Sequence, residues 1–399
     1  MKKVRLGIIG VGNMGSTHLT NILDRKCPEI EVTAVADIDE SRLDRARNMV
    51  NQAREKHPEI PEIATFTDAM ELISSGQVDA IIVAVPHYDH PRYCIAGLQA
   101  GLHVMSEKPA GVYGKQVREL MAEADRHPNQ LYALMFNQRT NPVYRKMREI
   151  VQSGEMGRIR RCNWLITNWY RPQAYYDSGS WRATWSGEGG GVLLNQCPHN
   201  LDLWQWICGM PCKVSAHAHF GKWHDIEVED DVTAYVEYPN GATGTFITST
   251  ADAPGTNRFE IVLDGGMLIC DGNTLVMKKL DMLEPEFSKT NTVPFASPKC
   301  ETVTVDCTGC GDNSQHVGVL NAFAAAILRG EPLIADGREG INGLTLSNAM
   351  HLSTWLGKEI ELPMDDELYW NELQKRIKTS RRKVNVNSVI ADTKGTYNS

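Results

Sequence analysis

The 399-residue sequence lacks several features that mark other protein classes. No apolar run approaches the roughly 20 residues that a helix needs to cross a bilayer. Positive charge is not in excess, because the formal net charge is −8. These absences argue against a membrane-spanning protein, and they give no electrostatic reason to expect nucleic acid or an anionic membrane surface as a partner.

The ten cysteines form neither a disulfide framework nor a zinc pattern. They are scattered and lie mostly in apolar surroundings, as expected for reduced thiols. Cys307 and Cys310, with Cys300 upstream, lack a second ligand pair at zinc spacing, so we interpret them as part of a loop and predict no metal site. The apolar run after residues 1–3 is too short and too rich in glycine for a signal peptide, and we expect a cytoplasmic protein.

The beginning of the chain has the pattern of a dinucleotide-binding fold. A short apolar strand at 4–9 runs into a glycine-rich turn at 10–15, a helical run follows, and a β-branched strand at 30–36 ends at Asp37. A GxGxxG turn alone is weak evidence. Here strand, glycines, helix, strand and acid occur in the required order and at the required spacing.

Each glycine of this turn has a physical role. Gly10 permits the tight turn, Gly12 lets the backbone approach a pyrophosphate, and Gly15 allows the helix to pack closely on the strand. The pyrophosphate then lies at the positive end of the helix, which opens with Asn13 and Met14.

Asp37 predicts NAD rather than NADP as the cofactor. Its carboxylate can accept hydrogen bonds from both hydroxyls of the adenosine ribose, whereas a 2′-phosphate would be repelled there. Arg42 is near enough downstream to meet a phosphate and is a further candidate cofactor contact, but we favour a solvated helix position for it.

The alternation of strands and helices continues to residue 138. Strands predicted at 4–9, 30–36, 63–66, 79–85, 102–105 and 131–136 indicate a doubly wound parallel sheet, a Rossmann domain, with ligands beyond the carboxyl ends of the strands. The candidate cofactor contacts at these ends are Pro86, His87, His90, Glu107, Lys108 and Asn137.

Beyond a connecting helix at 142–153 the pattern changes to longer strands without helices between them. Strands predicted at 158–168, 212–220, 230–238, 243–249, 258–263 and 267–270 indicate a large, mostly antiparallel open sheet. Helices at 197–208, 312–329, 340–356 and 366–377 are expected to cover one face. The free face is a predicted surface for a homodimer or homotetramer.

We therefore predict an α/β chain of two domains. Residues 1–138 form the NAD-binding Rossmann domain, residues 139–378 form an α+β domain for substrate binding and oligomerisation, and residues 379–399 form a polar tail. A chain of this length can support two separate cores.

An aromatic-rich segment in the second domain is a candidate sugar platform. It contains Trp164, Trp169, Tyr170, Tyr175, Tyr176, Trp181 and Trp185, with Arg171 and Arg182 interspersed. Pyranose rings stack their C–H faces on aromatic rings, and arginine donates hydrogen bonds to ring hydroxyls. We select Tyr170, Arg171 and Tyr176 as substrate contacts and expect about half of the rings to be ordinary packing residues.

With these motifs in place, the chain resembles the Gfo/Idh/MocA family, the relatives of glucose-fructose oxidoreductase and inositol dehydrogenase, over about residues 4–375. The motifs that carry the resemblance are Gly10 to Gly15 followed by His18, Pro86 with His90, Glu107-Lys108-Pro109, residues 154–157, Gly189-Gly190-Gly191 with His199 and Asp202, and residues 228–232. The family implies metal-free hydride transfer between a sugar or polyol carbon and nicotinamide.

The resemblance also implies roles for single residues. Lys108 would lie beside the nicotinamide and hydrogen-bond the reacting hydroxyl, and His199 would act as general base in oxidation and general acid in reduction. Trp181 and Arg182 resemble a Trp-Arg pair near the nicotinamide. These roles agree with the chemistry, because hydride loss from an alcohol requires a proton acceptor near neutral pKa, and a nearby lysine can stabilise alkoxide charge.

One position departs from the inositol dehydrogenase pattern. Those relatives carry Asp four residues before the catalytic histidine, whereas this chain has Asn195, which cannot titrate. We assign Asn195 to substrate hydrogen bonding. Asp202, one helical turn beyond His199, either orients that histidine or is a structural carboxylate. His316 resembles a position that sometimes reaches the site in relatives.

Three functions are compatible with these residues. The first, which we predict, is an NAD-dependent dehydrogenase that oxidises a secondary hydroxyl of a sugar or glycoside. The second is a glycosidase that oxidises C3, eliminates the aglycone and restores the cofactor. The third is a non-catalytic NAD-binding regulator, for which loss of Lys108 or His199 would be the signature, but both are present.

Overall fold

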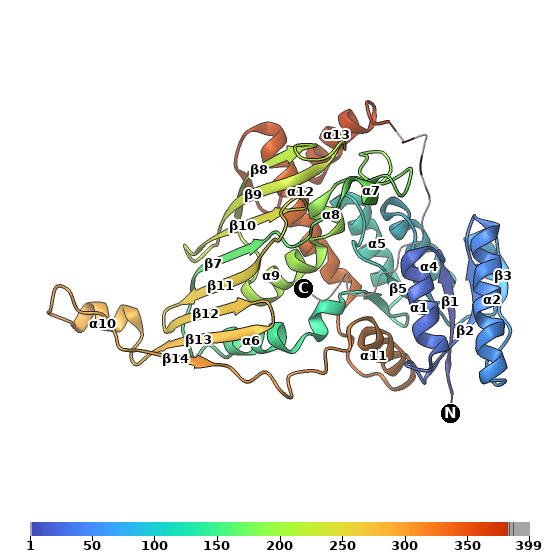
Figure 1. The fold of residues 1–399 in the computed structure, drawn as a ribbon, viewed down its shortest axis with the longest axis horizontal. Helices are drawn as coiled ribbons and strands as arrows, with labels where there is room; N and C mark the ends of the chain where they lie inside the picture. Colours follow the sequence, from blue (N-terminus) through green and yellow to red (C-terminus); the bar gives the residue numbers. More distant parts are fainter. Residues whose placement is uncertain (1, 382, 384–385, 387–399) are drawn as a thin grey trace.

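Two β-sheets organise the chain, and most of its long helices lie between or beside them (Figure 1). The computed structural model describes residues 2–381, 383 and 386, so most of the predicted tail 379–399 lies outside the described residues. No helix in the described part of the chain combines the length and apolar character needed to cross a bilayer.

The first sheet is parallel and has the strand order β3-β2-β1-β4-β5-β6, which confirms the Rossmann prediction. Its strands are β1 (Val4–Ile9), β2 (Ile30–Ala36), β3 (Ala64–Phe66), β4 (Ala80–Val83), β5 (His103–Ser106) and β6 (Tyr132–Leu134). Its helices are α1 (Asn13–Leu23), α2 (Glu40–Lys56), α3 (Ala69–Ser74), α4 (His90–Gln99) and α5 (Gly114–Arg126), with short 3₁₀ turns η1 (His87–Asp89) and η2 (Asn137–Thr140).

The second sheet has nine strands in the order β14-β13-β12-β11-β7-β10-β9-β8-β15, and only the β7–β10 pair is parallel. The strands are β7 (Ile159–Ile166), β8 (Lys213–Phe220), β9 (Glu229–Glu237), β10 (Thr243–Ser249), β11 (Asn257–Leu263), β12 (Gly266–Asp271), β13 (Thr274–Leu280), β14 (Cys300–Thr304) and β15 (Ile360–Glu361). The mostly antiparallel prediction is confirmed. Strands β13 to β15, which lie towards the sheet edges, were not predicted. Every residue of β14 is exposed, so no buried alternation marks it.

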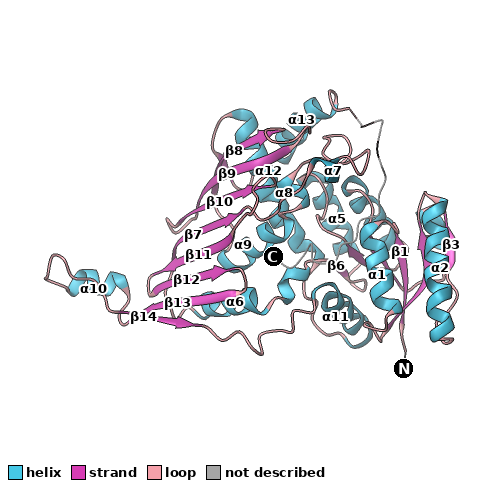
Figure 2. Cartoon of the chain, viewed as in Figure 1, coloured by secondary structure: helices cyan, strands magenta, loops and turns pink. Residues whose placement is uncertain are grey.

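The helices of this half lie mainly on one face of the large sheet, towards the first domain (Figure 2). They are α6 (Pro142–Ser153), α7 (Gln173–Tyr176), α8 (Val192–Asn195), α9 (Pro198–Cys208), α12 (Gly340–Leu356) and α13 (Asp366–Ile377), with the turn η3 (Gly337–Glu339). Helix α10 (Glu284–Thr290) instead projects away from the body of the molecule (Figure 1).

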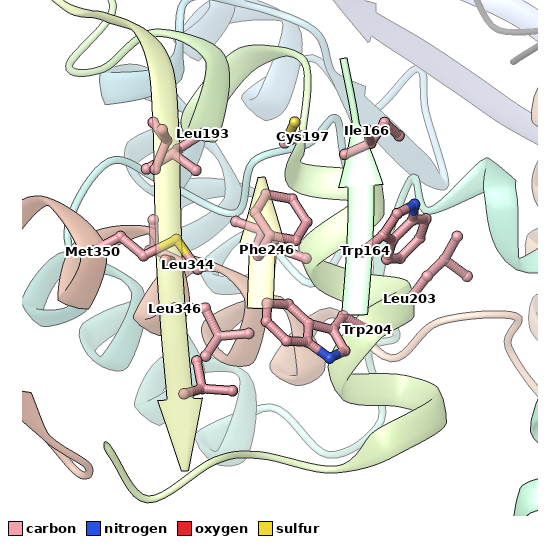
Figure 3. Packing of buried hydrophobic residues seen from close by; sticks show 14 of the residues in the cluster. Trp164, Ile166, Leu193, Cys197, Leu203, Trp204, Phe246, Leu344, Leu346 and Met350 are labelled. Carbon is pink, nitrogen blue, oxygen red and sulfur yellow. The ribbon is translucent and has the colours of Figure 1, made fainter. Parts of the chain in front are cut away.

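The core between α9 and the large sheet is aromatic (Figure 3). Trp204 of α9 stacks on Phe246 of β10 with ring centroids 5.2 Å apart, and its indole N–H donates to Cys162 Sγ at 3.0 Å. Trp164 of β7 stacks on Phe259 of β11 at 4.3 Å. These contacts fix α9, the helix that carries His199, on the sheet.

Helix α11 (Gln315–Arg329) corrects one prediction. We expected residues 312–329 to cover the second sheet, but Val319, Leu320, Phe323 and Ala324 are buried in one cluster with β1 of the first sheet. The apolar stripe of a helix shows that one face is buried and does not identify the surface that covers it.

Candidate active site

The glycine turn leaves room for a phosphate where it was predicted. Gly10 has φ +88°, and a Cβ at Gly15 would lie 1.8 Å from the Gly10 carbonyl oxygen, so both positions require glycine. A Cβ at Gly12 would meet only Arg42 Nη1, at 3.8 Å. Gly12 is also the N-cap of α1 and offers no side-chain cap, so the pyrophosphate of a dinucleotide fits at this helix end.

Asp37 is buried at the end of β2 and is fixed by the backbone. Its carboxylate accepts hydrogen bonds from Val11 N at 2.9 Å and Asp39 N at 3.0 Å. Arg42 Nη1 lies 3.6 Å from Asp37 Oδ2, and Arg42 Nε lies 3.5 Å from Asp39 Oδ2. Arg42 is therefore an ion-pair partner of both carboxylates rather than simply a solvated helix residue.

Histidines occupy the end of β4, after Pro86. His90 Nδ1 lies 2.7 Å from the carbonyl oxygen of Pro109, and its Nε2 lies 2.7 Å from that of Val85, so the ring joins the segments that follow β4 and β5. His87 is also buried, with its ring 5.8 Å from that of Trp181. Burial lowers the pKa of both histidines.

A buried hydrogen-bonded pair, Glu107 with His18, lies at the start of the 107–109 segment. Glu107 Oε1 is 2.7 Å from His18 Nε2, and Glu107 Oε2 accepts from the backbone N–H of Lys108 at 3.2 Å. Burial opposes ionisation, but the hydrogen bond and charge of His18 outweigh it and lower the pKa of Glu107 to about 2. The ring of His316, on α11, lies 5.7 Å from that of His18, so His316 belongs to this cluster.

Lys108 and Asn195 meet across the two domains. The Lys108 ammonium group donates to the backbone carbonyl of Asn195 at 2.8 Å. The Asn195 amide group in turn donates to the carboxylate of Glu188. Burial lowers the pKa of Lys108, and the charges of Glu107 and Glu188 act in the opposite direction.

His199 is the most unusual polar group of the site. It is 3% exposed, and neither ring nitrogen has a hydrogen-bond partner among the described residues. Its ring lies edge-on to Phe136, with centroids 6.2 Å apart. Burial and the charge of Lys108 lower the pKa of His199 well below its ordinary value, so the imidazole is neutral and can accept a proton.

Asp202 does not orient His199, and the structural alternative is correct. Its carboxylate accepts from Arg139 Nε at 2.8 Å and Nη2 at 2.6 Å, in a bidentate pair that is almost fully buried. The Arg139 guanidinium also lies over the rings of Phe136 and Trp206. Asn137, a predicted cofactor contact in the same turn, donates to Gln315 of α11.

The aromatic segment separates into core and site residues. Trp164, Trp169 and Trp185 are buried. Tyr176 is also buried, and its hydroxyl donates to Thr250 Oγ1 at 2.7 Å, whereas Tyr170 is 48% exposed.

Tyr175, which was not selected as a substrate contact, holds the arginines instead. The guanidinium groups of Arg182 and Arg171 lie 4.6 Å and 5.3 Å from the centroid of its ring. Its hydroxyl accepts from Arg182 Nη1 at 2.9 Å. Sequence reasoning also missed Glu188, for which the only local signal is its place immediately before three glycines.

Known proteins share this architecture. Residues 4–135 match the family described as "Oxidoreductase family, NAD-binding Rossmann fold", and residues 144–269 match the "GFO/IDH/MocA C-terminal domain". Rhizopine catabolism protein MocA of Rhizobium meliloti is 28% identical over 210 residues, which are 52% of this chain and 58% of MocA, so that match spans little more than half of the relative.

Two further relatives match over nearly their whole length. D-glucoside 3-dehydrogenase of Escherichia coli K12 is 25% identical over 387 residues, 90% of this chain and 97% of the relative. The WlbA dehydrogenase of Chromobacterium violaceum, solved with NADH and UDP-GlcNAcA, superposes with a TM-score of 0.73 at 26% identity and covers 92% of this chain and 97% of its own. With both domains matched and the nucleotide turn in place, the chain belongs to the Gfo/Idh/MocA family of oxidoreductases and binds NAD through its Rossmann domain.

Proposed function

We propose that this protein is a dehydrogenase that oxidises a secondary hydroxyl of a sugar or glycoside with NAD. The observation that carries the proposal is His199. Neither ring nitrogen of this buried imidazole has a hydrogen-bond partner among the described residues, and burying unpaired polar atoms costs free energy. A bound ligand that hydrogen-bonds to the ring would remove that cost. His199 lies close enough to Lys108 for that charge to lower its pKa.

The two side chains divide the chemistry of the hydroxyl group. NAD held by the glycine turn at 10–15 and by Asp37 would supply the hydride acceptor. Neutral His199 accepts the hydroxyl proton at a ring nitrogen, and Lys108 donates a hydrogen bond to the hydroxyl oxygen and stabilises the charge that develops there. Lys108 uses one donor on the Asn195 carbonyl, and an ammonium group has three.

The surroundings of these residues support a sugar as substrate. Arg171 acts on the pKa of Lys108 by charge, lies against the Tyr175 ring and follows the exposed Tyr170, and arginine beside aromatic rings suits a sugar. Relatives over nearly the whole chain are named D-glucoside 3-dehydrogenase and WlbA dehydrogenase, the latter solved with UDP-GlcNAcA.

We also propose that the enzyme is located in the cytoplasm.

The first test is NADH absorbance with purified protein, NAD and a panel of free sugars, polyols, neutral glycosides and carboxylated sugars. We expect NADH to form with one class and His199→Asn to lower kcat by about 100-fold or more. His57→Asn, at the exposed C-terminal end of α2, is the matched control. Because the pKa of His199 is lowered, kcat/KM should stay level as pH falls through the ordinary histidine range.

Other outcomes identify other functions. Full turnover by the His199→Asn variant would contradict the proposed base. Release of aglycone that needs NAD but accumulates no NADH would indicate oxidation followed by elimination, and silence across the panel would favour a regulator.

A further inference from the structure

Glu188 contacts several predicted site residues at once. It is 2% exposed, and its carboxylate accepts from the side-chain amide of Asn195 and from Ala183 N, the latter at 2.6 Å. Its backbone carbonyl oxygen lies 3.2 Å from His87 Nδ1. Arg182 Nη1 lies 3.9 Å from the same carboxylate. The predicted nicotinamide side of the site and its substrate side are therefore joined through one residue.

The backbone before and after Glu188 adopts conformations that fix the position of this residue. Gly189 has φ +85°, and a Cβ there would lie 2.3 Å from a Val112 methyl group. Ala183 has φ +56°, an unfavourable conformation for a residue with a Cβ. The bond from Ala183 N to Glu188 stabilises this turn, which carries Trp181 and Arg182.

The contact with Asn195 determines which end of its amide faces a ligand. Because Nδ2 donates to Glu188, the Asn195 Oδ1 atom remains to accept a hydrogen bond, such as one from a sugar hydroxyl. The backbone carbonyl of Asn195 holds the Lys108 ammonium group. Asn195 itself is uncharged. The carboxylate that it contacts belongs to Glu188.

We propose that Glu188 is a positioning residue of the sugar-oxidising site: its carboxylate orients the Asn195 amide towards a substrate hydroxyl and holds Lys108 and Arg182 by charge. The inference rests on the proposed function. It assigns to residue 188 the negative charge that the inositol dehydrogenase pattern places at residue 195.

The pKa of Lys108 provides a readout that a purely structural role of Glu188 would not change. Burial lowers the pKa of Lys108, Glu107 and Glu188 raise it, and Arg182 and Arg171 lower it. The charge of Lys108 in turn lowers the pKa of five neighbouring groups, which are His87, His90, Cys197, His199 and His316. Removal of the Glu188 charge leaves fewer groups that favour the ammonium form.

The test compares Glu188→Gln with Glu188→Asp. In Glu188→Gln we expect the alkaline limb of the kcat/KM profile to move about one pH unit lower, because Lys108 loses its proton more readily. Glu188→Asp keeps the negative charge on a shorter side chain. The alkaline limb of the kcat/KM profile should therefore stay at the same pH, while the value of kcat/KM falls. Glu227→Gln is the control: within the described part of the chain, Glu227 accepts from Trp185 N, Ser380 Oγ and Arg381 N and from none of the site residues.

A charge exchange provides a readout that does not need turnover. Asn195→Asp places a second carboxylate against Glu188, so the melting temperature of this variant should fall below that of the wild type. The double variant Glu188→Gln/Asn195→Asp should recover most of that loss. Additive changes in melting temperature, or an unmoved alkaline limb in active Glu188→Gln enzyme, would overturn the inference. A wild-type protein without turnover, combined with a coupled charge exchange, would count against the proposed function instead.

Discussion

The predicted preference for NAD over NADP depends on one side chain, that of Asp37. Its carboxylate is fixed by two backbone N–H groups and is 3.6 Å from the Arg42 guanidinium. Arg45 lies close by and donates to the carbonyl oxygen of Val11 at 2.7 Å. Two guanidinium groups thus stand near the predicted ribose position, where we expect the Asp37 carboxylate to oppose a 2′-phosphate.

Asp37→Ser should therefore relax the preference for NAD. Without the carboxylate, Arg42 and Arg45 are available to a 2′-phosphate, and the ratio of kcat/KM for NADP to that for NAD should rise at least about tenfold. Asp39→Ser, which also removes a partner of Arg42, should leave the ratio nearly unchanged. An unchanged ratio in Asp37→Ser would show that the carboxylate does not select the cofactor.

At the residue scale, a local constraint marks some positions in the sequence. The positive φ of Gly10, the tight packing at Gly15 and the place of Asp37 at the end of β2 agree with the predicted turn, and the cofactor roles of these residues stay predictions. Glu188 and Tyr175 have no such local mark. Their importance arises from contacts with Asn195 and Arg182, which other segments bring to them.

At the scale of elements, α9 is held from two sides. Its aromatic face packs on the large sheet, and Asp202 pairs with Arg139 from η2 at the end of the first domain. Arg139 also reaches Glu339 of η3 at 2.9 Å. Since His199 lies one turn before Asp202, this buried pair fixes the register of the histidine relative to the nucleotide domain.

Asp202→Asn should destabilise the protein by about 3 kcal/mol, because it leaves the buried Arg139 guanidinium without its main countercharge. Urea unfolding followed by tryptophan fluorescence measures the change. Lys26→Gln, which removes an exposed pair with Asp24 in the first domain, should change stability little. Equal effects of the two substitutions would mean that the buried pair does not anchor α9.

Elements with a strong pattern were predicted close to their observed bounds, such as α6 at 142–153 and β10 at 243–249. The missed strands are different. β14 is exposed along its length and is recognisable only by its pairing with β13. Strands of this kind form because a neighbouring edge offers hydrogen bonds, which local sequence does not report.

At the scale of the whole molecule, the outer face of the large sheet is the main candidate for self-association. Leu165 of β7 is 38% exposed and pairs in register with Ile247 of β10, so the two side chains share that face. Tyr235 of β9 is 40% exposed. We propose that two copies of the chain meet through this face.

Leu165→Glu should then convert the oligomer to a monomer, because it places a charge within the buried interface. Light scattering coupled to size-exclusion chromatography measures the mass. Met70→Glu, the same kind of change at a 40% exposed position of the first domain, should leave the mass unchanged. A wild-type monomer, or an unchanged oligomer in Leu165→Glu, would contradict this interface.

The sequence by itself determined what depends on neighbouring residues: the glycine turn, the acid at the end of β2, most strands and helices of both domains, and the motifs that contain Lys108 and His199. Only the tertiary structure decided that α11 packs on the first sheet, that Asp202 pairs with Arg139, and that Glu188 holds Asn195. The physical reason is that backbone conformation is constrained locally, whereas the partner of a buried face or carboxylate is settled by competition among distant segments for burial and hydrogen bonds.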